Sequence, residues 1–301
     1  MITTSQTRQG AQTFEAAGLR HQAWFRETLT RLLKNKGAVA GLVTLLVTVV
    51  VIIFAPVFAP YDPIQANTNA TLAGPSLTHL LGTDTIGRDV LSRILYGGRL
   101  SLLVGVLAIA IACGVGFPLG MIAGYYGSWV DRVISRVIDV MLAFPGILLA
   151  LAVVAVLGSS VLNVTIAVGI SLIPGFVRLV RSSFLSAKEN VYVEAARVIG
   201  VGDGRIMIRH ILPNMIASVV VLASVAMGWA IIIGASLSFL GLGAQAPTPE
   251  WGADLASGRE WIRSAWWMTT FPGLAIMVVI VAINWLGDGL RDALDPRLRN
   301  R

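Results

Sequence analysis

A polar stretch, VYVEAARVIGVGDGRIMIRHILPN, interrupts the apolar sequence between Val191 and Asn214. The whole chain is 55% hydrophobic and only 13% charged, whereas soluble proteins carry about 25% charged residues. The side chains in this stretch that could do chemistry or bind a charged surface are Glu194, Arg197, Asp203, Arg205, Arg209 and His210. Such a segment could take part in catalysis, lie on lipid headgroups or bind a protein partner.

Signatures of catalysis are missing from the sequence. None of the three lysines follows a glycine, so there is no P-loop that could hold ATP phosphates. His21, His79 and His210 are far apart and lack metal-ligand spacing, and there is no G-x-S-x-G elbow. We therefore predict that the chain is not an enzyme and needs no cofactor or metal.

Local signals predict two short helices in the stretch. Val191, Ala195, Val198 and Ile199 fall at positions i, i+4, i+7 and i+8, which form one narrow face of a helix. Gly200 can take the left-handed conformation that ends a helix.

A second helix is expected from Arg205 to Leu212, with Asp203 as its N-cap and Pro213 at the entry to the next apolar run. The small residues Ala195 and Ala196 favour a protein partner over lipid headgroups.

The elements that position this stretch are predicted to be membrane spans. A span needs about 20 apolar residues, and in lipid the backbone must satisfy its own hydrogen bonds. Six runs qualify: Ala38–Ala59, Leu100–Ala123, Val140–Leu157, Val161–Val177, Met215–Leu237 and Trp266–Leu286. The third is expected to begin near Val133, with Arg136 and Asp139 in its first turns. The sequence thus predicts an all-α integral membrane protein with six transmembrane helices.

The loops divide by charge into two sets. Alternate loops hold 18 and 5 of the 23 lysines and arginines. The rule that positive loops stay inside places both termini and the polar stretch in the cytoplasm. It also accounts for the basic character of the chain without a nucleic-acid partner. A basic leader before an apolar run could be a cleaved signal peptide, but this run is too long for one.

The spacing in the polar stretch is more specific than its composition. Glu194-Ala195-Ala196 is followed after three residues by Gly200, and Pro213 comes twelve residues later. This pattern resembles the EAA loop of the membrane subunits of binding-protein-dependent ABC importers. The family usually has Ile where this chain has His210, although the peptide-importer branch often reads R-H-I-L-P.

Three further segments are similar to the peptide-importer branch. LLGTDTIGRDVLSRILYGGRLSLLVG (80–105) resembles the segment that precedes the transport module in peptide permeases. SLSFLGLGAQAPTPEWGADL (236–255) and GDGLRDALDPRLR (287–299) resemble the C-type subunit of dipeptide, oligopeptide and glutathione importers. In the first segment Asp84, Arg88 and Asp89 are expected to pair at an exposed site, where ion pairs contribute little.

The resemblance implies the type I ABC importer permease fold, located in the bacterial cytoplasmic (inner) membrane. The polar stretch would be the coupling helix that docks on an ATP-hydrolysing subunit. The residues implied are Glu194, Ala195, Ala196 and Gly200 for docking, and Arg205, Arg209 and Pro213 for the second arm. Implied partners are a second, B-type permease, two ATP-binding subunits and a periplasmic or lipid-anchored peptide-binding protein, with membrane lipid around them.

The predicted organisation is a cytoplasmic N-terminal tail (1–37), a first transmembrane helix (38–59), a periplasmic or extracellular segment (60–98), a five-helix transport module (99–288) with its EAA loop (181–213), and a cytoplasmic C-terminal tail (289–301). Pro145 and Pro174 are candidates for helix kinks that line the pathway.

Two questions stay open in the sequence. Cargo could be dipeptides, oligopeptides, glutathione, nickel chelates or opines. An ion-coupled carrier or channel acting alone is a function of another class. The middle of the spans holds no Asp, Glu, Lys or Arg, which disfavours a proton-coupled carrier but says less about sodium.

Overall fold

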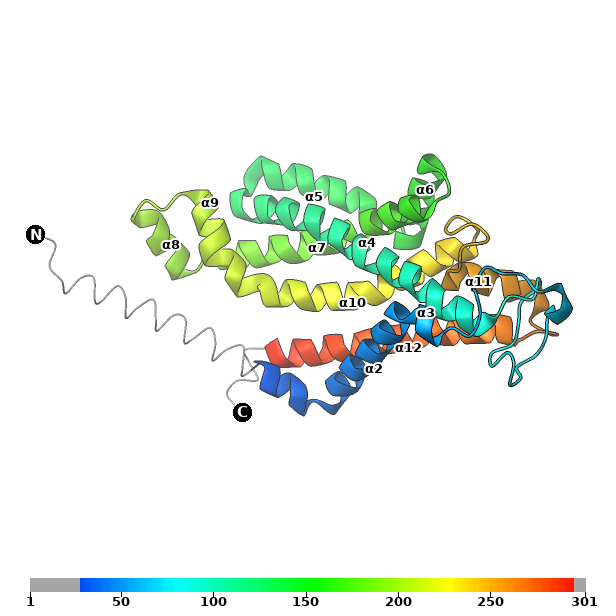
Figure 1. The fold of residues 1–301 in the computed structure, drawn as a ribbon. Helices are drawn as coiled ribbons and strands as arrows, with labels where there is room; N and C mark the ends of the chain where they lie inside the picture. The colour runs from blue at the N-terminus through cyan, green and yellow to red at the C-terminus, as the bar shows by residue number, and fades with distance from the viewer. Residues whose placement is uncertain (1–27, 295–301) are drawn as a thin grey trace, which may run out of the picture.

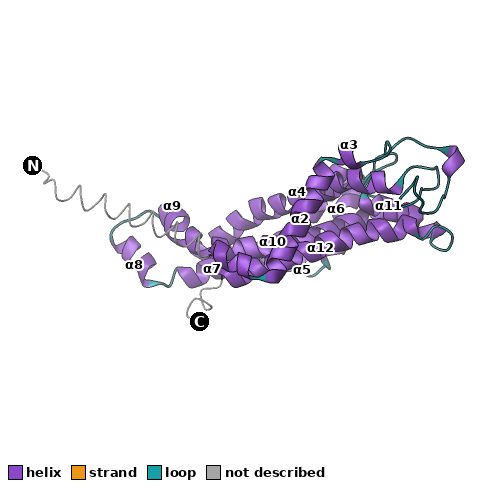
Figure 2. Cartoon of the chain, turned by 60° about the horizontal axis from the view of Figure 1, so that its bottom comes forward, coloured by secondary structure: helices purple, strands orange, loops and turns teal. Residues whose placement is uncertain are grey.

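The computed structural model describes residues 28–294, which contain helices and no strand (Figure 1; Figure 2). Figure 1 shows an elongated bundle in which α8 and α9 protrude at one end, and α11 lies near the other. The elements are α2 (Lys36–Ile53), α3 (Ala55–Phe58), η1 (Thr68–Ala70), α4 (Val90–Tyr126), α5 (Ser128–Leu142), α6 (Gly146–Leu157), α7 (Val161–Ala187), α8 (Val191–Val198), α9 (Asp203–Arg205), η2 (Ile206–Ile211), α10 (Leu212–Phe239), α11 (Trp251–Gly258), η3 (Arg259–Trp261) and α12 (Trp267–Leu294).

Five helical segments are long and apolar enough to cross a membrane: α2, α4, α7, the continuous segment Asp203–Phe239 that contains α10, and α12. The bent pair of α5 and α6 gives a sixth when it is counted as one span. The all-α fold is therefore confirmed, and so is the number of spans when the pair is counted once. Helices α4 and α12 run across the boundaries expected at 98/99 and 288/289, and parts of both predicted tails lie outside the described residues.

The third predicted run is not one straight helix. α5 ends at Leu142 and α6 starts at Gly146, with an angle of 93° between them. Pro145 lies at this break with a φ of −53° and a ψ of 136°, outside the helical range. Proline lacks the N–H that a helix needs, and its ring disfavours a helical conformation in the preceding residue, here Phe144.

Charged residues lie deeper in the helices than the apolar runs predicted. α5 begins at Ser128, so Asp139 lies near the C-terminal end of this helix rather than in its first turns. α7 continues beyond Val177 to Ala187 and therefore includes Arg178. The Arg178 Nη2 and Asp139 Oδ1 atoms are 3.0 Å apart. The helices that form the spans therefore include this charged pair, just outside the apolar runs that were expected to be free of charge.

Helices α4 and α7 make the most extensive contact between two described elements. Gly116, Gly120 and Gly124 recur every fourth residue, so they lie along one face of α4. A Cβ atom on Gly120 would lie 2.7 Å from Val180 Cβ and 2.8 Å from the Val177 carbonyl oxygen. The missing side chains let the two helices approach closely, as small residues do in membrane bundles.

Candidate functional site

The polar stretch forms a short helix that ends at a glycine. α8 covers Val191–Val198, and Gly200 follows it with a φ of +81°. The Gly200 N–H donates to the Arg197 carbonyl oxygen at 2.9 Å, and the Val201 N–H donates to the Ala196 carbonyl oxygen at 3.0 Å. This pair of bonds is the Schellman motif, which confirms the prediction that Gly200 ends the helix.

One side of α8 is buried and the other is open. Val193 and Ala196 pack against the body of the protein. Val191, Val198 and Ile199, which belong to the predicted apolar face, are 79%, 82% and 78% exposed. An apolar group of this kind at the end of a bundle is suited to contact with another protein.

The charged residues of the predicted site are exposed as well. The side chains of Glu194, Arg205 and Arg209 make no hydrogen bond or ion pair with other residues in the range 28–294. Ala195 and Gly200 are also exposed, whereas Ala196 is buried. The structure therefore brings the predicted docking residues to one loop, except that Ala196 supports the loop from beneath.

Gly202, rather than Asp203, occupies the N-cap position of the second helix. The prediction that Asp203 is the N-cap is therefore wrong by one residue. The Asp203 carboxylate instead accepts a hydrogen bond from the Tyr125 hydroxyl at 2.6 Å.

The second arm is continuous with the next span. The π-helical turn η2 links α9 to α10, and the Leu212 N–H donates to the Met207 carbonyl oxygen, five residues earlier. Pro213 cannot donate a backbone hydrogen bond, which fits a local departure from α-helical pairing. The arm therefore belongs to one helical segment of 37 residues, Asp203–Phe239, rather than to a separate helix.

Tyr125, at the end of α4, contacts both arms of the loop. Besides its hydrogen bond to Asp203, its ring lies 5.3 Å from the guanidinium carbon of Arg197, which is within cation–π range. Tyr125 belongs to a buried cluster that includes Val180, Phe184, Val193, Ala196, Ile206, Met207, Ile211 and Met215. Sequence reasoning missed Tyr125 because it lies far from the loop in the chain.

Tyr125→Phe is expected to loosen the loop without preventing membrane insertion. The change removes the hydrogen bond to Asp203, worth about 1 kcal/mol, and retains the ring beside Arg197. Backbone amides of residues 199–204 should then exchange hydrogen about fivefold faster, as measured by mass spectrometry. Tyr126→Phe is the matched control, because Tyr126 is 52% exposed. Equal exchange rates in the two variants would show that the Tyr125 hydroxyl does not hold the loop.

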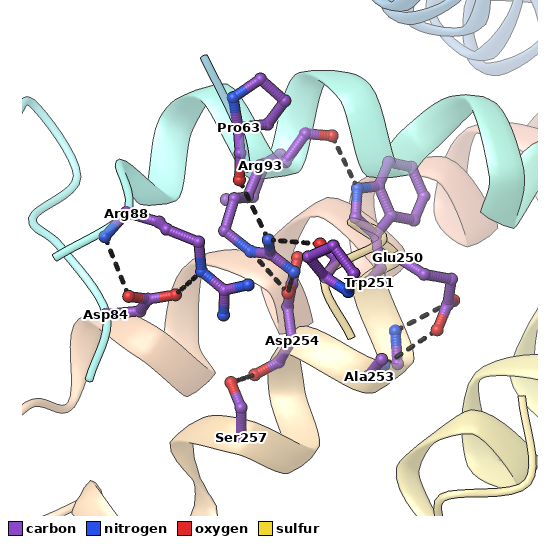
Figure 3. A network of polar contacts seen from close by, with 12 residues as sticks. Pro63, Asp84, Arg88, Arg93, Glu250, Trp251, Ala253, Asp254 and Ser257 are labelled. Atoms are coloured by element: carbon purple, nitrogen blue, oxygen red, sulfur yellow. Dashed lines mark hydrogen bonds and ion pairs between the residues drawn. The ribbon is translucent and has the colours of Figure 1, made fainter. Parts of the chain in front are cut away.

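A second polar network lies near the opposite end of the bundle and joins α4 to α11 (Figure 3). Arg93 Nε donates to Asp254 Oδ1 at 2.8 Å, and Nη2 donates to the same oxygen. Arg93 Nη1 donates to the carbonyl oxygens of Pro63 and Pro247, at 3.0 and 3.2 Å. One buried guanidinium thus ties together α4, the loop after α3 and the loop before α11.

The start of α11 is fixed to α4 by a further buried acid. Glu250 is its N-cap and accepts from the backbone N–H groups of Gly252 and Ala253 at 3.0 and 2.8 Å. It also accepts from the Ser101 hydroxyl of α4 at 2.9 Å. Sequence reasoning missed this contact because glutamate is not a preferred N-cap residue.

The Asp254 carboxyl is buried and only half satisfied. Its Oδ2 atom has no hydrogen-bond partner among residues 28–294. Burial raises the pKa of the Asp254 carboxyl to about 6, although the Arg93 guanidinium acts in the opposite direction. The folded protein therefore binds this proton more tightly than an exposed aspartate does.

The nearby pairing expected for Asp84, Arg88 and Asp89 is partly confirmed. Arg88 Nε donates to Asp84 Oδ2 at 2.5 Å, but both residues are buried, so the expectation of an exposed pair is wrong. Asp89 instead contacts His79 Nδ1 at 3.0 Å and caps the start of α4. In the described part of the chain, no three His, Cys, Asp or Glu residues are grouped as a metal site would require.

The two prolines proposed as kinks differ in position. Pro145 is exposed at the break between α5 and α6. Pro174 is buried within α7, so the open face of that helix is formed by other residues. A role of either proline in a pathway stays a prediction.

The candidate site is thus an exposed two-armed loop carried by a bundle of apolar helices that are long enough to span a membrane. A family model described as "Binding-protein-dependent transport system inner membrane component" matches residues 116–300. A second, "N-terminal TM domain of oligopeptide transport permease C", matches residues 23–75. The chain belongs to this family of ABC importer permeases and is a multi-pass protein of the inner membrane.

Similar proteins agree with this assignment. The chain is 49% identical over 276 residues to the dipeptide transport system permease protein DppC of Alkalihalophilus pseudofirmus, covering 92% of this chain and 91% of the relative. It is 52% identical over 227 residues to the glutathione transport system permease protein GsiD of Pectobacterium atrosepticum, covering 75% of each. A chain of the MetNI methionine ABC transporter in an inward-facing conformation shares the fold, with a TM-score of 0.56, 15% identity, and coverage of 68% of this chain and 97% of that one.

Proposed function

We propose that this permease serves an importer of dipeptides or oligopeptides and that α8 receives the motion of the ATP-hydrolysing subunits. The observation that carries the proposal is the open apolar face of α8, formed by Val191, Val198 and Ile199, on a loop held from beneath by a buried cluster. Glu194 and Ala195 lie on the exposed surface of the same helix. The predicted docking role of the EAA loop fits this arrangement.

The connection from α8 to the second arm is short: a turn over residues 199–202 separates α8 from the helical segment that begins at Asp203. Displacement of α8 would act on the second arm through the turn at Gly200 and through Tyr125, which contacts both arms. The second arm is part of the segment Asp203–Phe239, so its movement would tilt a complete span. Partner closure would thus change the bundle by a rigid-body shift.

The proposed orientation places α8 and both termini in the cytoplasm, supported by the distribution of 18 and 5 basic residues between alternate loops. ABC importer permeases work with ATPase and substrate-binding partners. We propose in particular one B-type permease, two ATP-binding subunits and a periplasmic or lipid-anchored binding protein. The chain itself is proposed to hydrolyse no ATP, because it has no P-loop.

Two relatives suggest two cargo classes. The name of the Alkalihalophilus protein specifies dipeptides, and that of the Pectobacterium protein specifies glutathione. Both are short, flexible molecules with amide bonds and free carboxylates. We propose peptides as the cargo class because the match to the dipeptide permease covers 92% of the chain, and glutathione is the second candidate.

Glu194→Lys and Ala195→Trp should lower ATP-dependent dipeptide uptake at least tenfold while the protein still inserts. The first reverses a charge on the open surface of α8, and the second adds bulk where a partner must approach closely. Uptake would be measured in proteoliposomes that contain the complete importer, with co-purification of the ATPase subunits as a second readout. Glu189→Lys is the control, because Glu189 is exposed just before α8. Normal uptake by both α8 variants would exclude docking through this helix.

A further inference from the structure

The open face of α7 is unusual for a membrane span. Apart from Leu162 in its first turn, the exposed residues of α7 are Gly175, Arg178, Ser182 and Ser186. Their spacing of three or four residues places them on one face of the helix. We call these four residues the α7 stripe. The stripe contains no large apolar side chain.

Part of the stripe lies at the depth of the apolar core. Asp139, the ion-pair partner of Arg178, follows Ile138, which packs in a buried cluster with Leu119 of α4 among its neighbours. Leu119 lies inside the apolar run Leu100–Ala123. The Arg178 and Asp139 side chains are nevertheless 60% and 55% exposed. Charges at this depth face a water-filled cavity or another protein, because exposure to lipid is costly.

Another helix of the same chain shows what a lipid-facing surface looks like. Apart from Lys36 at its start, the exposed large side chains of α2 are apolar: Val43, Leu46, Val47, Val49, Val50 and Ile53. None of the four residues of the α7 stripe has a large apolar side chain of this kind, so the two faces are suited to different surroundings.

Polar groups of α10 continue the stripe toward α8. Asn214 and Ser218 of α10, together with Ser182, Ser186 and Tyr192, line a groove of about 790 Å³. The groove lining contains no charged side chain. Hydroxyl and amide groups can donate and accept hydrogen bonds, which suits water and the backbone of a passing peptide.

We infer that the α7 stripe and this groove form the wall of the water-filled half of the transport pathway on the α8 side. Arg178 of the stripe and its ion-pair partner Asp139 of α5 offer one cation and one anion to a cargo that carries both charges. This inference rests on the proposed import function.

Thiol labelling tests the inference in the complete importer. In a Cys113→Ser background, which removes the one native cysteine, single cysteines are placed by Ser182→Cys and Ser186→Cys. Val47→Cys reports the lipid-facing surface, and Val180→Cys reports the core, since Val47 is 57% and Val180 0% exposed. A charged methanethiosulfonate reagent is applied, without ATP, to the importer in detergent and in inside-out vesicles.

The two stripe cysteines are expected to react at least tenfold faster than both controls. Rates as slow as those at Val47→Cys would overturn the inference, because lipid or a partner subunit would then cover the stripe. Uptake of dipeptide by the same variants separates the two proposals. Slow labelling in an importer that still transports dipeptide refutes only the proposal that the stripe lines the pathway. Absence of ATP-dependent dipeptide uptake by the unmodified complex refutes the import function on which that proposal depends.

Discussion

Gly120→Val is expected to reduce the yield of folded protein at least tenfold. A Cβ atom at this position would approach Val180 Cβ to 2.7 Å and the Val177 carbonyl oxygen to 2.8 Å. Neither neighbour can move aside easily, because one is backbone and the other is part of a β-branched side chain. Relief requires α4 and α7 to separate, and their contact is the most extensive in the bundle. Overpacking at a single site already costs about 1–3 kcal/mol, and separation of the two helices would also loosen the contacts along the rest of their interface.

The measurement is the amount of monodisperse protein after detergent extraction and size-exclusion chromatography. Gly114→Val is the matched control, since it lies on the same helix and a Cβ atom there would meet nothing within 4 Å. If Gly120→Val and Gly114→Val gave equal yields, close approach at Gly120 would not hold α4 and α7 together.

Sequence alone predicted the spans because the length of an apolar run is a local property. It did not predict where the helices extend beyond these runs, as α7 does to include Arg178. It also treated the third run as one helix, although Pro145 was already a sign of a break. The 93° angle between α5 and α6 depends on packing against other helices, which no single stretch encodes.

In the candidate site, too, local features could be predicted from the sequence and long-range contacts could not. Gly200 could be predicted as a helix end because glycine has a specific conformational role in the Schellman motif. The support from Tyr125 could not be predicted, since it acts across 78 residues of chain on Asp203. Similarly, Arg93 and Asp254 are separated by 161 residues and gave no local pattern. Contacts of this kind are fixed by the tertiary fold and become visible only with it.

Arg93→Leu is expected to destabilise the end of the bundle that carries α11 more than any exposed arginine substitution would. It leaves Asp254 buried without its cation, and it removes the donor that serves the Pro63 and Pro247 carbonyl oxygens. Breaking one side of a buried ion pair typically costs about 3–5 kcal/mol. Thermal unfolding of the purified protein would show this as a lower Tm, with Arg136→Leu as the exposed control.

The decrease in Tm caused by Arg93→Leu should depend on pH. The folded-state pKa of Asp254, about 6, is above the ordinary value of 3.8. Protonation of Asp254 therefore stabilises the folded state at low pH, and this stabilisation is lost as the pH rises through about 6. Without Arg93 the pKa should rise further, so Arg93→Leu should lower Tm less at about pH 5 than at about pH 8. An equal loss at both values would mean that Asp254 does not carry the effect.

The double variant Arg93→Leu with Asp254→Leu separates an unpaired charge from lost packing. Replacing both members of a buried ion pair by apolar residues is often neutral, because neither charge then has to be desolvated. We therefore expect the double variant to recover more than half of the Tm lost by Arg93→Leu, although the two proline carbonyl oxygens stay without their donor. No recovery would show that the hydrogen bonds from Arg93 to Pro63 and Pro247, rather than the pairing with Asp254, hold α4 to α11. The two outcomes assign different roles to one guanidinium, and only the first makes the stability of this end of the bundle sensitive to pH.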